Sequence, residues 1–161
     1  MDRNAYSFYA LEDFELSDRM FLPEAVGMKR TETEDTAKFS RCKRGKIVRF
    51  TSFGGLENAN DVNNHCEDLL FENGSFIGGE QAAIVVKGRS RNIVYRHVSI
   101  KRSRHSRIDV LWDDYSDQSK EYSTGVLDQV YTPDGSPVRL AFGRYHRPQI
   151  TPGTKVRIIW W

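Results

Sequence analysis

A stretch of this chain repeats itself after 24 residues, and this feature constrains the fold more than any other. Asp68–Phe76 aligns with Asn92–Ile100, and at the same offset Ile84 falls on Ile108. Both copies are short apolar alternations separated by corners rich in Gly, Ser and Arg, without a helical period. Repeats of this length that consist of strands alone indicate stacked turns of a parallel β-solenoid.

The repeat also predicts how the chain is divided. Residues 46–161 carry the repeating alternation and are expected to form the β-helix domain, whose first rung starts at Lys46. Residues 1–45 lack the repeat and are expected to form an N-terminal arm or cap. Equivalent side chains should stack in ladders, for example Leu69, Ile93 and Val126.

Composition and charge exclude several classes of function. The net charge of the 161-residue chain is only +2, so no overall field attracts it to nucleic acid or membrane. No apolar run approaches the ~20 residues of a membrane helix, and the N-terminus lacks the pattern of a secretory signal. We therefore expect a protein made in the cytosol, without a membrane or nucleic-acid partner.

Basic residues are concentrated between residues 81 and 108, where eight Lys or Arg occur without an acid. At the repeat offset such side chains would stack in rows of like charge, which is unfavourable unless something anionic faces them. The sequence therefore predicts a basic face for a partner: an acidic glycan, an acidic protein or the acidic N-terminal segment. The residues assigned to this face are Arg89, Arg91, Arg96, Lys101, Arg102 and Arg104.

The runs Asn64–Gly79, Ala83–Gly88 and Asn92–Ile100 together carry a resemblance to a known group of proteins. They resemble the rungs of right-handed parallel β-helices of the pectate-lyase-like superfamily, over residues 46–142. The resemblance implies an all-β fold: a short single-stranded right-handed parallel β-helix of about four to five rungs, ~4.8 Å apart. The superfamily includes polysaccharide lyases, glycoside hydrolases, adhesins and tail or surface proteins of bacterial viruses, so fold does not transfer function.

Asp113 and Asp114 are the candidate catalytic residues. Glycoside hydrolysis needs two carboxylates, and the resemblance implies that an adjacent Asp pair can serve. However, the Gly-His-Gly motif that accompanies such a pair in polygalacturonase-like enzymes is absent from this sequence. The alternative is that both residues open a polar loop over residues 113–122, because Asp is favoured in turns.

The two cysteines predict neither a disulfide framework nor a metal site. Cys42 and Cys66, with the adjacent His65, fit no usual zinc spacing. The sequence predicts no metal and no cofactor. It leaves open one bridge between the cysteines and favours two buried thiols.

Apolar residues at both ends of the domain predict contacts with other subunits. The last strand ends in Ile159, Trp160 and Trp161, which are apolar on both faces. The N-terminal segment carries scattered aromatic residues that are expected to hold a neighbour, among them Phe8, Phe14 and Phe21. The ends of a solenoid otherwise expose core and unpaired backbone groups.

These observations lead to one functional expectation and two alternatives. We expect a structural protein of a virus-like particle, such as a phage capsid decoration, tail or spike component, typically a homotrimer. The first alternative is a lyase or hydrolase acting on acidic glycans, and the second is a non-catalytic glycan-binding module. The expected location is the virion if the protein is viral, and otherwise the cytoplasm.

Overall fold

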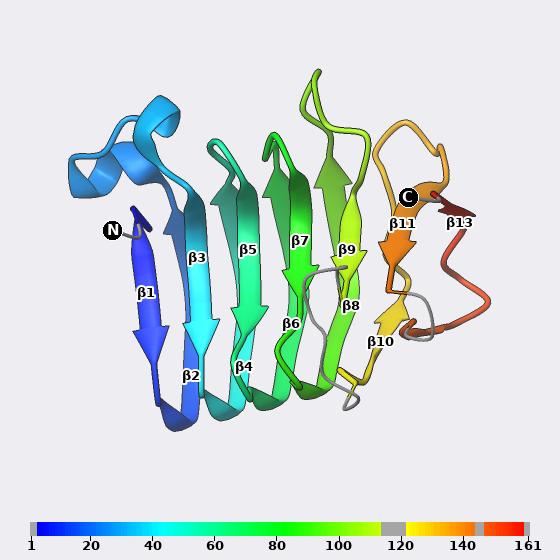
Figure 1. Cartoon of the computed structure of the whole chain (residues 1–161), viewed down its shortest axis with the longest axis horizontal. Coiled ribbons are helices and arrows are strands. Elements are labelled where there is room, and N and C mark those ends of the chain that lie inside the picture. The colour runs from blue at the N-terminus through cyan, green and yellow to red at the C-terminus, as the bar shows by residue number, and fades with distance from the viewer. Residues whose placement is uncertain (1–2, 114–121, 144–146, 160–161) are drawn as a thin grey trace.

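The structure is a computed structural model and describes residues 3–113, 122–143 and 147–159. Two sheets dominate it, and all of their strand pairs are parallel (Figure 1). The seven-stranded sheet, here called the odd sheet, contains β1 (Tyr6–Tyr9), β3 (Asp35–Ser40), β5 (Asn58–Asn63), β7 (Ala82–Val86), β9 (Val110–Trp112), β11 (Val138–Phe142) and β13 (Val156–Ile158). The six-stranded even sheet contains β2 (Glu12–Phe21), β4 (Lys43–Phe53), β6 (Glu67–Ile77), β8 (Arg91–Lys101), β10 (Gly125–Asp128) and β12 (Gln149–Ile150).

The chain passes from one sheet to the other after every strand. Each odd strand and the even strand that follows it therefore make one coil, and each coil pairs with the coils before and after it (Figure 1). This arrangement is compatible with a parallel β-helix-like fold, and it agrees with the expectation of an all-β protein with parallel strands.

The repeat seen in the sequence corresponds to the register of the central strands. β6 pairs with β8 at the repeat offset, so that Leu69 lies beside Ile93. The same offset relates β5 to β7, where Val62 lies beside Val86. The expected stacking of equivalent side chains is thus confirmed for these coils.

Later ladder positions differ from the expected ones because the connections lengthen. In the odd sheet, Ile84 lies beside Val110 instead of Ile108. In the even sheet, Ile93 lies beside Gly125, the residue before the expected Val126. The residues that lengthen these connections lie between the strands, in the segments 102–109 and 113–124.

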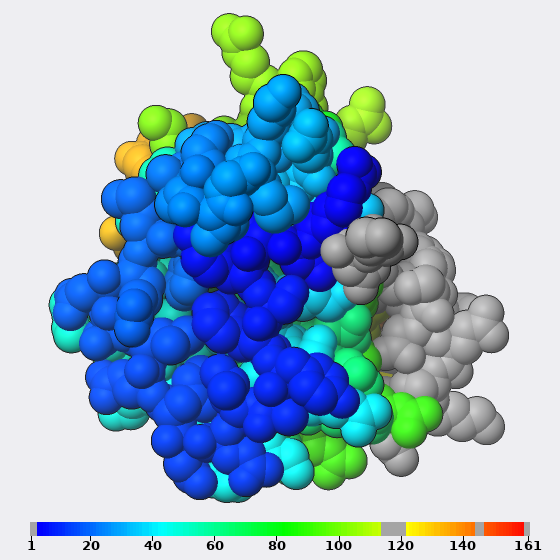
Figure 2. All heavy atoms as spheres, turned by 90° about the vertical axis from the view of Figure 1, so that its left-hand side faces the viewer, coloured from blue at the N-terminus to red at the C-terminus, as the bar shows by residue number. Residues whose placement is uncertain are grey.

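The N-terminal segment, which was expected to be an arm or cap, continues both sheets. β1 pairs with β3 and β2 with β4, so that Tyr6 lies beside Ala37 and Glu12 beside Lys43. This offset is longer than that of the repeat because two 3-10 turns, η1 (Pro23–Val26) and η2 (Arg30–Glu32), separate β2 from β3. The paired strands therefore begin at Tyr6, before the Lys46 at which the sequence places the first rung, and this first coil faces the viewer in Figure 2.

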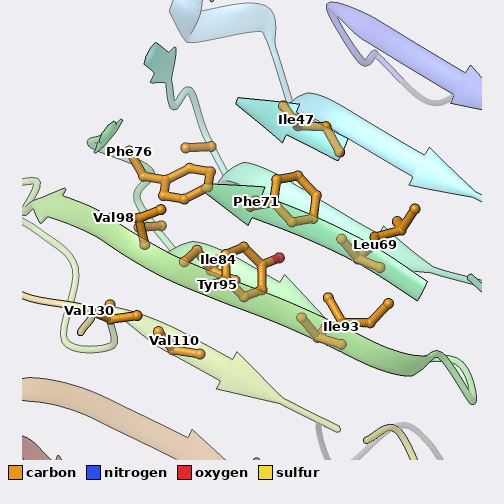
Figure 3. Packing of buried hydrophobic residues seen from close by; sticks show 14 of the residues in the cluster. Ile47, Leu69, Phe71, Phe76, Ile84, Ile93, Tyr95, Val98, Val110 and Val130 are labelled. Atoms are coloured by element: carbon orange, nitrogen blue, oxygen red, sulfur yellow. The ribbon is translucent and has the colours of Figure 1, made fainter. Parts of the chain in front are cut away.

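The core is a column of side chains between the two sheets. Phe71 and Tyr95 (Figure 3) stack with ring centroids 4.7 Å apart. Phe8 stacks on Phe39 at the same distance. The Tyr95 hydroxyl donates a hydrogen bond of 2.5 Å to Asn60 Oδ1 inside this column. Each large side chain buried here contributes roughly 1.5–3 kcal/mol, which makes the column the main source of stability.

The strands of the even sheet bend at two positions that recur from strand to strand. At each bend one residue has a left-handed backbone, with φ between 51° and 57°. The first bend comprises Asp13, Arg44, Asp68 and Asn92, and the second comprises Asp18, Arg49, Asn73, His97 and Gln129. At each bend the pairing skips one residue on both strands, or two at the second bend of β4 and β6, and the register is the same on either side. Because equivalent bends lie side by side in neighbouring strands, the even sheet changes direction along two lines that run parallel to the stack.

Candidate functional site

Asp113, the first catalytic candidate, is buried and bonded to the backbone of Ser123. Asp113 is 1% exposed, and its Oδ2 accepts a 2.8 Å hydrogen bond from the backbone N–H of Ser123. This bond joins the two ends of the segment that the sequence interprets as a polar loop. Asp114, the second catalytic candidate, lies outside the described residues.

The central basic residues stack beside acids instead of forming rows of like charge. In the register of β6 and β8, Arg91 lies beside Glu67 and Arg96 beside Glu72. Arg96 Nε also donates a 2.9 Å hydrogen bond to Asp128 Oδ2 on the next strand. The expected like-charge rows are therefore wrong at these two positions.

Arg102 belongs to a buried ion-pair network. Its Nε and Nη2 donate to Asp109 at 2.8–3.0 Å, and Arg139 donates to the same carboxylate through its backbone N–H and side chain. Asp109 is 1% exposed. Burial alone would raise the pKa of Asp109, but hydrogen bonds from Arg102 and Arg139 outweigh it and keep this pKa below its ordinary value.

The other basic candidates lie at opposite ends of β8. Arg89 occupies the corner before the strand, with φ 60°. Lys101 is its last residue, and Arg104 is exposed in the connection that follows. The six predicted residues are thus spread from the corner before β8 to the connection after it.

The predicted interface residues divide into core and end positions. Phe21 is 4% exposed and belongs to the core. Phe8 and Phe14 are half-buried and pack against the core at the N-terminal end of the stack. Ile159 packs against a smaller apolar cluster built around Leu111. Trp160 and Trp161 lie outside the described residues.

The sequence analysis did not predict a large hollow on the outside of the even sheet, an open groove of about 810 Å³. It runs along the stack across β2, β4, β6 and β8, and Tyr131 closes it beyond β8. The second bend produces this hollow, because it turns every strand at the same place. The lining residues are Asp18, Arg19, Met20, Arg49, Phe50, Thr51, Asn73, Gly74, Ser75, His97 and Tyr131.

Two rows of side chains run along the groove. The first row consists of the residues at the second bend, one from each strand: Asp18, Arg49, Asn73 and His97. The second row lies two positions further along each strand and consists of Met20, Thr51, Ser75, Ser99 and Tyr131. The groove therefore offers hydrogen-bonding groups at intervals of ~4.8 Å, the spacing of neighbouring strands.

The charges in the groove are largely paired. Arg49 Nε and Nη2 donate to the two carboxylate oxygens of Asp18 at 2.8 and 3.2 Å. The hydrogen bond from Arg49 lowers the pKa of Asp18, and the bond to Asp18 raises the pKa of Arg49. With Arg19 as the remaining cation and His97 neutral, the lining residues carry a formal charge of +1.

Exposed apolar side chains stand at the two ends of the second row. Met20 is 60% exposed and Tyr131 is 53% exposed. Between them, Ser99 Oγ donates a 2.9 Å hydrogen bond to Ser75 Oγ. The groove thus combines hydroxyl, amide and imidazole groups with one accessible aromatic ring.

The described residues contain no cluster of three or more His, Cys, Asp or Glu side chains that could hold a metal ion. Among the same residues, no helix has the length and apolar character needed to cross a membrane. Compared with protein-family models, curated proteins and solved structures, the chain has no significant match.

Proposed function

We propose that this protein is a non-catalytic glycan-binding module whose site is the groove of the even sheet. One observation carries the proposal: the groove repeats equivalent polar positions from strand to strand along the stack. A polymer with repeating hydroxyl groups can therefore make similar hydrogen bonds on successive strands. Solenoids present extended concave surfaces of this kind to elongated ligands.

The side chains of the groove suit the two faces of a sugar ring. Asn73 and His97 offer both donors and acceptors to hydroxyl groups, as do Thr51 and Ser75. Tyr131 offers an exposed ring against which the C–H face of a sugar can pack. A non-catalytic role accords with the contacts of Asp113, which join the two ends of a loop.

The charge of the groove favours an uncharged glycan over the acidic one that the sequence suggests. Asp18 neutralises Arg49 within the groove. Arg96 and Arg102, two residues of the expected basic face, are ion-paired elsewhere. Among the described residues that line the groove, an acidic polymer would therefore meet only Arg19 as an additional cation.

Binding to a panel of soluble polysaccharides tests this proposal. The panel contains neutral polymers (β-glucan, xylan, mannan) and acidic ones (polygalacturonate, alginate), and affinity electrophoresis or calorimetry reports binding. Tyr131→Ala should weaken binding at least about tenfold, which corresponds to the loss of ~1.4 kcal/mol. Tyr9→Ala is the matched control, because Tyr9 is also exposed, at 65%, but lies outside the groove.

Asn73→Gly extends the test to the first row of the groove. Glycine accepts the left-handed backbone of this position (φ 55°) and removes the side chain with its amide. Weaker binding with an unchanged melting temperature would support the groove as the site. The proposal would be refuted if the parent protein bound none of the polymers, or if the Tyr131 and Asn73 variants bound them as tightly as the parent does.

A second candidate function is assembly into a larger particle, such as a phage capsid decoration, tail or spike. It is supported by the apolar side chains that are only half-buried at both ends of the stack. These are Tyr6, Phe8, Phe14 and Leu16 at one end, and Ile150, Val156 and Ile158 at the other. A further subunit at either end would complete their burial.

Light scattering on the purified protein tests the assembly role. A trimer or larger species that dissociates in Leu16→Lys would support it, whereas a monomer at all accessible concentrations would contradict it.

We further propose that the fold is a right-handed parallel β-helix. It is supported by the course of the chain in Figure 1, where odd strands descend in front, even strands rise behind and the chain advances to the right.

A further inference from the structure

Cys42 and Cys66 occupy the same corner position in neighbouring coils. The residues around them are in register, with Ser40 beside Asn63 and Lys43 beside Glu67. The backbone N–H of Glu67 donates a 2.9 Å hydrogen bond to the Cys42 carbonyl, which continues the parallel ladder through the corner. The two thiols are therefore neighbours on adjacent strands.

The thiols are free, and both are fully buried. Cys42 Sγ lies 3.4 Å from the carbonyl oxygens of Phe8 and Ser40, and Cys66 Sγ lies 3.4 Å from those of Phe39 and Asn63. These carbonyls belong to residues that are themselves paired, Phe8 with Phe39 and Ser40 with Asn63. The two side chains therefore occupy equivalent positions in the corner, one coil apart.

The same corner position in later coils carries a hydroxyl group. Ser90 Oγ accepts a hydrogen bond from the backbone N–H of Cys66, and Ser123 Oγ accepts one from that of Ser90. A serine thus meets the requirements of this position. Two adjacent cysteines add one property that serine lacks, the capacity to form a covalent bond with one another.

We propose that Cys42 and Cys66 form a reversible disulfide, a modification site that links the β3–β4 coil to the β5–β6 coil. Neighbouring parallel strands lie ~4.7–4.9 Å apart. A disulfide accepts Cα–Cα separations of about 4.4–6.8 Å. The bond therefore requires no rearrangement of the backbone.

The reaction requires an external disulfide, such as oxidised glutathione, as the oxidant. The Cys42 thiolate attacks one sulfur of the reagent, forms a mixed disulfide and releases the first thiolate. Cys66 then loses its proton and attacks the Cys42 sulfur, which releases the second thiolate. Two protein thiols are oxidised by two electrons, and one reagent disulfide is reduced to two thiols, which take up the two protons.

The surroundings assign the first step to Cys42. The turn between β1 and β2 covers this thiol, and the two residues that flank Ala10 in this turn, Tyr9 and Leu11, are 65% and 36% exposed. Terminal coils open most easily, so this turn should expose Cys42 before Cys66. The hydrogen bond from Cys66 lowers the pKa of Cys42 to about 7 and raises that of Cys66, which accords with this order.

Mass spectrometry after incubation of the folded protein with oxidised glutathione tests the proposal. We expect the intact mass to fall by two hydrogens, both cysteines to resist alkylation, and digestion to yield one peptide that joins Cys42 to Cys66. The melting temperature should rise by roughly 5–10 °C, because the bond closes a loop the length of one coil in the unfolded chain.

Two serine variants separate the roles of the thiols. Cys66→Ser should retain one glutathione on Cys42, and Cys42→Ser should stay unmodified under the same conditions. Circular dichroism verifies that both variants fold, as the serines at positions 90 and 123 lead us to expect. Persistence of a glutathione adduct on the parent protein, a disulfide between two molecules, or full alkylation of both thiols after oxidation would overturn the proposal.

Discussion

Replacement of Asp109 by Asn tests whether the basic residues near β8 serve the fold or a ligand. Asp109 lies just before β9 and is 1% exposed. Its carboxylate accepts hydrogen bonds from the side chain of Arg102 and from the backbone and side chain of Arg139, all at 2.8–3.3 Å. Asparagine has nearly the same shape, but it removes the charge and turns one acceptor into a donor that faces two guanidinium groups.

The size of the expected loss of stability follows from the burial of this network. The side chains of Arg102 and Arg139 are 23% and 21% exposed, so solvent compensates little for the lost charge. Removing one partner of a buried ion pair costs about 3–5 kcal/mol. For a chain of this size, that corresponds to a melting temperature roughly 6–20 °C lower.

Urea unfolding at pH 7 measures this change, and the pH dependence supplies an independent check. The hydrogen bonds keep the pKa of Asp109 below its value of 3.8 in the unfolded chain. The carboxylate therefore stabilises the fold above pH 3.8, and this contribution is lost as the pH falls through the folded pKa. The free energies of unfolding of the parent and of Asp109→Asn should therefore become more similar in strong acid.

Asp128→Asn is the matched control, because Asp128 pairs with Arg96 at a more exposed site and should change stability much less. A loss below about 1 kcal/mol for Asp109→Asn, the range of surface ion pairs, would refute this reasoning. It would also make Arg102 available again as a ligand-binding residue.

Three further substitutions test particular contacts. Burial raises the pKa of Asp61 to about 8. The stability that its protonated side chain contributes is therefore complete below pH 3.8, its ordinary pKa, and is lost as the pH rises toward 8. Asp61→Asn should gain stability relative to the parent between about pH 4 and pH 8, and a free energy of urea unfolding that changes equally with pH in both proteins would contradict this. Tyr95→Phe should cost about 1–3 kcal/mol in the same assay, because Asn60 Oδ1 loses its buried donor; a neutral effect would show that this bond contributes nothing. Gly125→Ala should cost at least about 1–3 kcal/mol, because its Cβ would lie 2.0 Å from the Ile93 carbonyl oxygen; an unchanged melting temperature would contradict the pairing of β8 with β10.

The parallel strands could be predicted because the central coils are uniform in length. The offset between Leu69 and Ile93 is visible in the sequence, since no insertion separates the two rungs. The first coil could not be recognised in this way, because the 3-10 turns after β2 lengthen the offset between β2 and β4. The aromatic residues of the N-terminal segment consequently looked like parts of an arm, although Phe21 belongs to the core.

The charge pairs were predictable from the same repeat. When the repeat offset is applied to charged residues, Arg91 falls on Glu67 and Arg96 on Glu72, as in the register of β6 and β8. The density of basic residues along the chain does not reveal these pairs, because paired neighbours in the two sheets lie one coil apart. The pair between Arg102 and Asp109 is different, since it depends on the path of a loop that has no repeat.

The groove has no linear motif for the same physical reason. Its first row consists of Asp18, Arg49, Asn73 and His97, four chemically different residues that share only a left-handed backbone at the same bend. Asp, Asn and His are enriched in this conformation, but Arg is not, so the bend cannot be read from residue type alone. On Arg49 it must be imposed by the pairing of its strand with neighbours that bend at the same place. The register of the stack therefore determines both the shape of the groove and the order of its functional groups, and the second bend of each strand is the structural element on which the proposed binding site depends.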